Sequence, residues 1–432
     1  MIPIEEIPVD PGRGRVYEHG WQSWSPTATY SVSAVGERPR LDPAVMQTMC
    51  WRPGRPAPAD GFQGEGLLVV DPGDGGPVRL FAAPDGRSEV PSIRARLLDD
   101  RLLVEADGKV DRVAHEGTID AALAAWADGI AVAQRAAPTV WCSWYHYFGS
   151  VTADDVAENL GAIAAHDLPV EVVQIDDGWQ AEIGDWLTFS ERFAGLRALV
   201  GRIRDEGRRA GVWVAPFLGG ARSATVRAHP EWFMGDAGHN WDQDLRGLDV
   251  THPGARDHLR RVFTGLRELG FDYFKLDFLY AGALEGRRHE DMPGPVAYRQ
   301  GLGLIREAVG PEPYILGCGA PILPSVGLVD AMRVGPDVGL TVEPQQGDMS
   351  RPSQRAATVT TVARAWQHGR LWVNDPDCLV ARPAMREREA WARTVERYGG
   401  LRASSDRIRD LDEWGLGTTR RVLSAPPSFR PR

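Results

Sequence analysis

Two stretches of this sequence end a strand-like segment in an aspartate. The first, residues 272–278, reads Asp-Tyr-Phe-Lys-Leu-Asp-Phe, and the alternation of side chains along a strand places Lys275 and Asp277 on one face. The second, residues 331–337, has the same design, with Arg333 and Asp337 on one face. Two carboxylates at the ends of two strands are typical of a glycosidase pair, in which one is the nucleophile and the other the acid/base.

The two carboxylates need different surroundings if they are to share this chemistry. A nucleophilic Asp277 must stay ionised, and Lys275 is close enough in the sequence to favour its charged form. The acid must keep its proton until it is needed, and Asp337 follows Pro336 in a loop-like setting that would shield it in part. The plainer interpretations are a buried strand-end carboxylate bonded to Lys275, and a Gly-Pro-Asp turn with a solvated Asp337.

Strand-like and helix-like segments alternate from residue 139 onward. The expected strands are 139–144, 170–176, 211–216, 272–277, 314–318, 331–334, 371–374 and 401–404. The expected helices are 152–166, 196–210, 255–269, 298–309, 353–368 and 385–398. Such alternation predicts an α/β protein with parallel strands, and eight strands predict a (β/α)₈ TIM barrel. The alternative, an open doubly wound sheet, usually has a glycine-rich phosphate turn after its first strand, and residues 144–148 contain no glycine.

The remaining segments surround this barrel. Residues 1–125 contain short apolar runs separated by Gly- and Pro-rich turns, which predicts an N-terminal β-sandwich-like domain. Residues 126–138 are expected to be a linker, 139–415 the catalytic barrel and 416–432 a C-terminal tail.

Polar and aromatic side chains gather at the expected carboxyl ends of the strands, where barrel enzymes have their sites. They are Trp144, Asp176, Asp177, Trp213, Lys275, Asp277, Cys318, Arg333, Asp337 and the run 374–377. Aromatics, carboxylates and two cations suit a neutral polyhydroxylated ligand. The run 176–178, Asp-Asp-Gly, is either a turn or a pair of acceptors for sugar hydroxyls, whereas 374–377 is interpreted as a structural turn and Trp372 as a core residue. No His pair has ligand spacing, so no metal is expected.

Composition narrows the classes of partner. The 432 residues carry 49 basic and 59 acidic side chains, a net charge of −10, which disfavours nucleic acid and anionic membranes. The four cysteines lie far apart and are expected to be buried and reduced. No secretory signal or run of transmembrane length is evident, so the protein is expected to be cytoplasmic. Most of the 15 tryptophans are expected to be structural, with a few lining a site.

Seven short motifs together resemble the family 36 glycoside hydrolases of the α-galactosidase (melibiase) type. Six lie in the expected barrel, at 141–148, 174–177, 274–278, 316–321, 332–337 and 372–378. The seventh, His-Gly-Trp-Gln-Ser-Trp at 19–24, resembles a motif of that family's N-terminal domain. The resemblance extends from about residue 19 to residue 406.

The resemblance implies retaining hydrolysis, through a covalent glycosyl-aspartate, that releases terminal α-linked galactose from small oligosaccharides. It implies that Asp277 is the nucleophile and Asp337 the acid/base. By the same likeness, the implied substrate-binding residues are Asp176 and Asp177 (galactose 4- and 6-hydroxyls), Lys275, Cys318 and Arg333 (ring contacts), Trp144 and Trp213 (pocket wall) and Trp21 (reaching in from the N-terminal domain). No cofactor is implied. The partner is a small α-galactoside, and a homo-oligomer is compatible with the sequence.

The chain is expected to differ from the family in its two outer domains. Relative to the family, the N-terminal sandwich is expected to be truncated and the C-terminal β domain largely absent. One alternative function is a lyase that uses Lys275 as a Schiff base. The other is a sugar-binding relative without catalytic activity.

Overall fold

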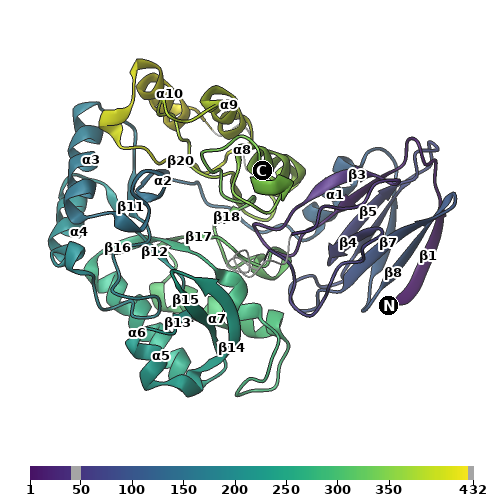
Figure 1. Ribbon diagram of the computed structural model, residues 1–432, viewed down its shortest axis with the longest axis horizontal. Helices are drawn as coiled ribbons and strands as arrows, with labels where there is room; N and C mark the ends of the chain where they lie inside the picture. The colour runs from purple at the N-terminus through teal and green to yellow at the C-terminus, as the bar shows by residue number, and fades with distance from the viewer. Residues whose placement is uncertain (40–49, 427–432) are drawn as a thin grey trace.

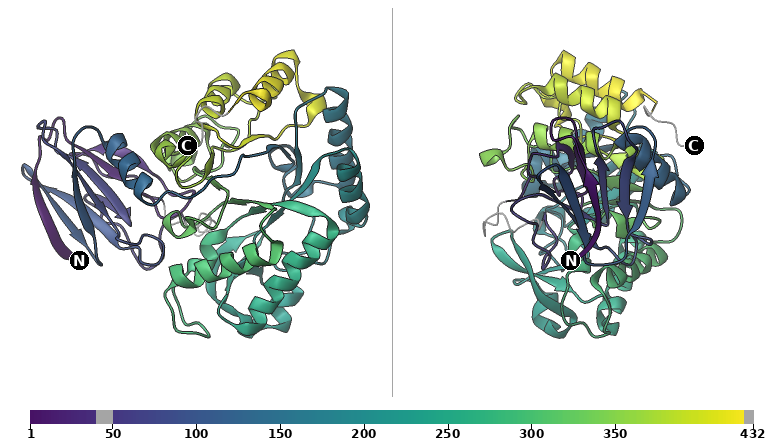
Figure 2. Two further views of the ribbon diagram at one scale, coloured as in Figure 1. Left: turned by 180° about the vertical axis from the view of Figure 1, so that it is seen from behind. Right: turned by 90° about the vertical axis from the view of Figure 1, so that its right-hand side faces the viewer.

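A computed structural model describes residues 1–39 and 50–426 of the protein. It contains a β-sandwich and a barrel that lie side by side, with helices α3 (Ala153–Ala165) and α4 (Leu196–Asp205) on the side of the barrel away from the sandwich (Figure 1). Figure 2 shows the same arrangement from behind and from the sandwich end. Among the described residues, no helix has both the length and the apolar character needed to cross a bilayer.

The sandwich consists of two antiparallel sheets. One has the order β1 (Ile2–Pro8), β8 (Arg101–Ala106), β7 (Ser92–Leu98), β4 (Phe62–Glu65). The other has the order β3 (Ala28–Ser31), β2 (Arg15–Glu18), β5 (Leu67–Asp71), β6 (Val78–Ala82), β9 (Asp111–His115). Leu68 and Val70 of β5 face the four-stranded sheet, while Leu67 and Val69 pack against other core residues on the opposite face. This central strand is apolar throughout because both of its faces are buried.

The barrel sheet has eight parallel strands, as the alternating sequence predicted. In spatial order they are β19 (Val373–Asp375), β18 (Ala331–Arg333), β17 (Tyr314–Gly317), β16 (Phe271–Leu276), β12 (Arg209–Val214), β11 (Val172–Ile175), β10 (Thr139–Cys142) and β20 (Arg402–Ser404). Strands β19 and β20 lie at the two ends of this order. The gap between them is narrowed by a hydrogen bond from the Leu401 N–H to the Asn374 carbonyl (3.0 Å) and by a parallel bridge between Leu379 and Ser404.

Helices cover the outside of this sheet through apolar faces. Besides α3 and α4 they are α6 (Pro253–Leu269), α7 (Gly294–Val309), α8 (Gln354–Ala363), α9 (Arg388–Tyr398) and α10 (Glu413–Ser424). In α6 the buried residues Leu259, Val262, Phe263 and Leu266 follow the spacing of one helix face. Helix α3 begins with a capping box, in which Thr152 and Asp155 each accept a hydrogen bond from the other's backbone N–H.

Two predictions about the elements were incomplete or wrong. A three-stranded sheet of β13 (Leu218–Gly220), β15 (Gln243–Leu248) and β14 (Phe233–Asn240) lies between β12 and α6, where only the next helix was predicted. The expected tail from residue 416 begins inside α10. That helix contains glycines and threonines, which have low helix propensity, but Asp412 caps it and burial of Val422 and Leu423 stabilises it. Residues 427–432 of the expected tail lie outside the described part of the chain.

Candidate active site

A cavity of about 410 Å³ lies at the carboxyl ends of the barrel strands. Its lining residues come from the strand ends, the β14–β15 hairpin, the loop after β18 and the N-terminal domain. They are Trp24, Trp144, Gly149, Asp176, Asp177, Trp213, Asn240, Trp241, Lys275, Asp277, Phe278, Pro336, Asp337, Ser350, Arg351 and Pro352. The sequence had predicted Trp144, Asp176, Asp177, Trp213, Lys275, Asp277 and Asp337 as site residues, and the fold brings all seven to this one cavity.

Asp277 lies directly after β16, and donors hold both of its oxygens. The indole Nε1–H of Trp213 donates to Oδ2 (2.8 Å), and the backbone N–H of Phe278 donates to Oδ1 (2.8 Å). Trp213 is in reach because β12 pairs with β16 in a register that sets it beside Lys275. Phe278 has a left-handed backbone (φ 50°, ψ 33°), which is uncommon outside glycine. The carboxylate is therefore fixed in orientation by two neutral donors.

Lys275 lies between two carboxylates. Its Nζ is 3.0 Å from Asp176 Oδ2 and 3.7 Å from Asp277 Oδ2. Burial alone would disfavour the charged ammonium, but the negative charges of Asp176 and Asp277 outweigh burial and raise the pKa of Lys275 well above its ordinary value. A protonated amine cannot form a Schiff base, so this environment disfavours the lyase alternative.

Asp177 points into the cavity from the turn after β11. Gln180 Nε2 donates to its Oδ1 (2.6 Å) and Trp241 Nε1 donates to its Oδ2 (2.7 Å). Burial raises the pKa of the Asp177 carboxyl, and these two donors work in the opposite direction. Adjacent Asp176 accepts from Gln174 Nε2 (2.7 Å) as well as from Lys275. Two acceptors thus stand side by side on one wall.

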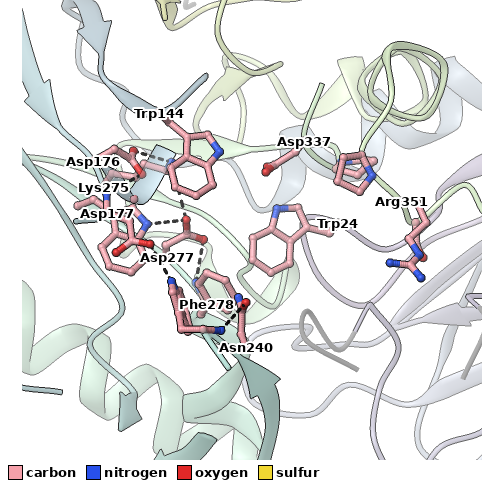
Figure 3. A pocket seen from close by; sticks show the side chains of 16 residues that line it. Trp24, Trp144, Asp176, Asp177, Asn240, Lys275, Asp277, Phe278, Asp337 and Arg351 are labelled. Atoms are coloured by element: carbon pink, nitrogen blue, oxygen red, sulfur yellow. Dashed lines mark hydrogen bonds and ion pairs between the residues drawn. The ribbon is translucent and has the colours of Figure 1, made fainter. Parts of the chain in front are cut away.

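Asp337 faces Asp277 from the other side of the cavity. Figure 3 shows the two carboxyl groups on opposite sides of the pocket, both turned toward the space between Trp144 and Trp24. The Asp337 side chain is 32% exposed, and Arg333 Nη1 donates to it at 3.1 Å. Its enclosure raises the pKa of Asp337 and the charge of Asp277 adds to the effect, although Arg333 and Lys275 oppose it. A raised pKa is what a proton donor at neutral pH requires.

Two predicted ligand contacts, Arg333 and Cys318, do not line the cavity. Arg333 is buried beneath it, where it forms ion pairs with Asp375 (3.2 Å) and Asp377 (2.7 Å) besides Asp337. Cys318 is buried at the end of β17, and burial raises the pKa of its thiol. The run 374–377, interpreted from sequence as a turn, therefore supplies the partners of Arg333. Trp372 is fully buried, which confirms its interpretation as a core residue.

Trp21, which was predicted to reach into the site, does not line the barrel cavity, whereas Trp24 does. The Trp21 indole lines a second cavity, in the N-terminal domain, with the Arg52 guanidinium 4.7 Å from its ring centroid. Trp24 lines the barrel cavity, and its ring meets Phe278 edge-on at 5.1 Å. The backbone between them is fixed to the barrel by hydrogen bonds from Ile322 N–H to Trp21 O (3.0 Å) and from Ser23 N–H to Ala320 O (3.0 Å).

Several lining residues had no signal that identified them in the sequence. Asn240 and Trp241 come from the unpredicted hairpin, and Ser350, Arg351 and Pro352 come from the long connection after β18. Aromatic Trp241 between Asn240 and Asp242 in a turn-like run could have been noticed, but nothing tied it to Asp177. Within the described residues, no group of three or more His, Cys, Asp or Glu side chains is arranged to hold a metal ion.

Several known proteins are similar to this chain. Residues 130–307 match the family model named Melibiase. An α-galactosidase of Escherichia coli is 29% identical over 188 residues, which cover 40% of this chain and 26% of that protein. The first curated relatives are thus matched over about a quarter of their length or less.

Solved structures extend the likeness to nearly the whole chain. The α-galactosidase TtGalA of Thermus thermophilus, solved in complex with p-nitrophenyl α-D-galactopyranoside, is 30% identical with a TM-score of 0.81. The alignment covers 98% of this chain and 89% of that one. The α-galactosidase AgaA of Geobacillus stearothermophilus, at 12% identity, 97% and 61% coverage and a TM-score of 0.65, is similar in fold.

Proposed function

This chain belongs to the melibiase family of α-galactosidases, and from that premise we propose that it releases terminal α-linked galactose from small oligosaccharides by a retaining double displacement. The observation that carries the proposal is the placement of Asp277 and Asp337 across one cavity in unlike surroundings. Asp277 has donors on both oxygens, and Asp337 is partly exposed with a raised pKa. Unequal carboxyls of this kind divide the roles of nucleophile and acid.

In the first step Asp277 Oδ attacks the anomeric carbon while Asp337 gives its proton to the departing glycosidic oxygen. The bond to the aglycone breaks, the aglycone leaves as an alcohol, and galactose remains bound to Asp277 as an ester. In the second step Asp337, now ionised, takes a proton from water, and the resulting nucleophile displaces Asp277 from the sugar. Two inversions at one carbon give net retention.

Binding of the sugar is assigned to the residues of the cavity that surround Lys275 and Asp277. Asp176 and Asp177 provide acceptors for hydroxyl groups, and Lys275 provides a cationic donor. The rings of Trp144 and Trp213 provide flat apolar surface. Support for oligosaccharide substrates comes from the T. thermophilus relative, which has also been solved in complex with stachyose.

The test is a panel of p-nitrophenyl α- and β-glycosides, including α-N-acetylgalactosaminide, with the released sugar followed by proton NMR. The proposal predicts turnover of the α-galactoside and appearance of α-galactose before mutarotation produces the β-anomer. First appearance of the β-anomer would contradict the retaining mechanism. Tight galactose binding without turnover of any glycoside would instead identify a sugar-binding protein.

A further inference from the structure

The buried carboxylate of Asp377 contacts two residues that flank Asp337 in the chain, Arg333 before it and Val338 after it. Its Oδ1 is 2.7 Å from Arg333 Nη2, and Arg333 in turn donates to Asp337. Its Oδ2 accepts the backbone N–H of Val338, the residue after Asp337, at 2.9 Å. Asp377 is fully buried and does not line the cavity. It therefore touches the peptide that carries Asp337 and the side chain paired with it, but not the space for substrate.

The position of Asp377 is itself closely determined. The Tyr145 hydroxyl donates to Oδ2, the Cys378 N–H donates to Oδ1 (2.7 Å), and the Asp377 N–H donates to Asp375 Oδ1 (3.0 Å). Its φ of 104° is rare for a residue with a Cβ, and such backbone persists where the surroundings determine it. Contacts from α2 (Trp144–Tyr147), β19 and the loop after β18 thus converge on this carboxylate.

Asp377 also changes the electrostatic environment of Asp337. The Arg333 guanidinium is shared by Asp337 (3.1 Å), Asp375 (3.2 Å) and Asp377 (2.7 Å). Because the carboxylates of Asp375 and Asp377 offset much of its positive charge, Arg333 lowers the pKa of Asp337 less than it would alone. Burial raises the pKa of Asp377 to about 7 against the opposing effect of Arg333, and the negative charge of Asp337 adds to the rise, so Asp377 shares the Arg333 charge fully only above neutral pH. The other ionisable groups facing Asp337 are Lys275, Asp277, Asp176, Tyr145 and Cys318.

We propose that Asp377 is a positioning residue for the acid/base Asp337, which it orients through Arg333 and Val338 and keeps able to carry a proton by sharing the Arg333 charge. This inference rests on the proposed function, because it needs Asp337 to be the proton donor. It assigns the 374–377 run a part in catalysis beyond a turn.

Asp377→Asn tests the proposal through dependence on the leaving group. The amide has one acceptor oxygen where the carboxylate has two, so it cannot hold both Arg333 and Val338 N–H. With methyl α-galactoside, whose leaving group needs a proton, kcat/KM should fall roughly 10- to 100-fold. With 2,4-dinitrophenyl α-galactoside, whose leaving group departs unprotonated, kcat/KM should stay within about threefold of wild type. Equal losses on both substrates would overturn the proposal.

The pH profile provides a second readout. Removing the negative charge of Asp377 leaves Arg333 less balanced, which lowers the pKa of Asp337. Because kcat/KM requires protonated Asp337, its alkaline limb should move to lower pH in the variant. An unmoved limb, or one moved to higher pH, would contradict the charge-sharing part.

Asp330→Asn is the matched control. Asp330 is another ion-paired aspartate, just before β18 at the opposite end of the barrel, bound to Arg135 (2.7 Å) and Arg306 (2.6 Å). Its loss should lower the melting temperature and leave the ratio of the two kcat/KM values unchanged. A changed ratio would mean that any broken ion pair of the barrel produces the signature, and would overturn the proposal.

Asp337→Asn and the double variant test the proposed function and this inference separately. Leaving-group selectivity in Asp337→Asn, with no further loss on adding Asp377→Asn, supports the proposal because the two residues then act as one unit. Equal losses on both substrates in Asp337→Asn would overturn the proposed function, and this inference with it.

If Asp377→Asn does not fold, Tyr145→Phe removes one donor from Asp377 and should show a smaller selective loss. Equal losses on both substrates in Tyr145→Phe would overturn the inference.

Discussion

Two tryptophans three positions apart in the chain have different surroundings. Trp24 enters the barrel cavity, whereas Trp21 stands under Arg52 in the N-terminal domain. The indole N–H of Trp24 is buried, and among residues 1–39 and 50–426 no acceptor lies within hydrogen-bonding distance of it. A buried donor without an acceptor is costly, and a small turn of the Trp24 ring, which lines the cavity, would bring this N–H within reach of a sugar hydroxyl.

Trp24→Phe keeps a ring and removes this N–H. We expect KM for a p-nitrophenyl α-galactoside to rise roughly two- to tenfold, the worth of one neutral hydrogen bond, with little change in kcat. Trp21→Phe is the matched control, which should lower the melting temperature while leaving KM near the wild-type value. Steady-state kinetics and thermal unfolding of both variants decide the matter, and an unchanged KM in Trp24→Phe would contradict the assignment.

The position of a single residue could be predicted from the sequence where the alternation of one strand determines it. Asp277 and Lys275 share a face because of strand alternation, and both reach the cavity. The position could not be predicted where a turn determines it, because the choice between Trp21 and Trp24 depends on how residues 20–25 dock on the barrel. Strand alternation also contains no sign of the partners of Arg333, because two of its three carboxylates come from a different strand end.

At the scale of elements, the β14–β15 hairpin completes the wall that the strand ends begin. Trp241 and Asp242 at its tip both have left-handed backbone (φ 52° and 54°), a turn that joins the two strands tightly. The tip places the Trp241 ring against Phe278 (5.0 Å) and Trp213 (6.2 Å), and its N–H on Asp177. One hairpin thereby contacts Asp177 and the two residues, Trp213 and Phe278, that donate to Asp277.

Trp241→Phe should weaken binding in a pH-dependent way. The indole N–H is one of two donors that hold down the pKa of Asp177, which burial raises, so its removal raises that pKa further. Protonated Asp177 loses acceptor capacity, and the rise of KM on the acid side should therefore begin at higher pH in the variant. KM measured from about pH 4 to about pH 7 tests this. Trp232→Phe, at the base of the same hairpin, should leave the profile unmoved, and coincident profiles for Trp241→Phe and wild type would contradict the role.

The barrel could be predicted at this scale because each strand and helix has its own hydrophobic period. The hairpin could not, since β14 is interrupted by two register shifts and contains glycines that hide any alternation. Helix α10 was missed for a similar reason, because tertiary burial overrides the weak propensity of its residues.

At the scale of the whole molecule, the cavity belongs to two domains. The fully buried Arg364 guanidinium donates to the backbone carbonyls of Ser23 (2.6 Å), Gln22 (3.0 Å) and Val334 (3.1 Å), and Trp366 Nε1 donates to the Tyr17 hydroxyl (3.0 Å). These contacts fix the segment that carries Trp24 beside the loop that leads to Asp337. The sequence shows an arginine in a helix-like run and contains no sign of this partner 341 residues away.

The proposed mechanism requires that Asp277 becomes covalently bound to the sugar. A slowly hydrolysed fluorinated α-galactosyl fluoride, incubated with the enzyme and followed by proteolysis and mass spectrometry, tests it most directly. We expect one added sugar on the peptide that contains Asp277, and none in Asp277→Asn. A sugar found on Asp337 or Lys275, or continued turnover of an aryl α-galactoside by Asp277→Asn at the wild-type rate, would contradict it.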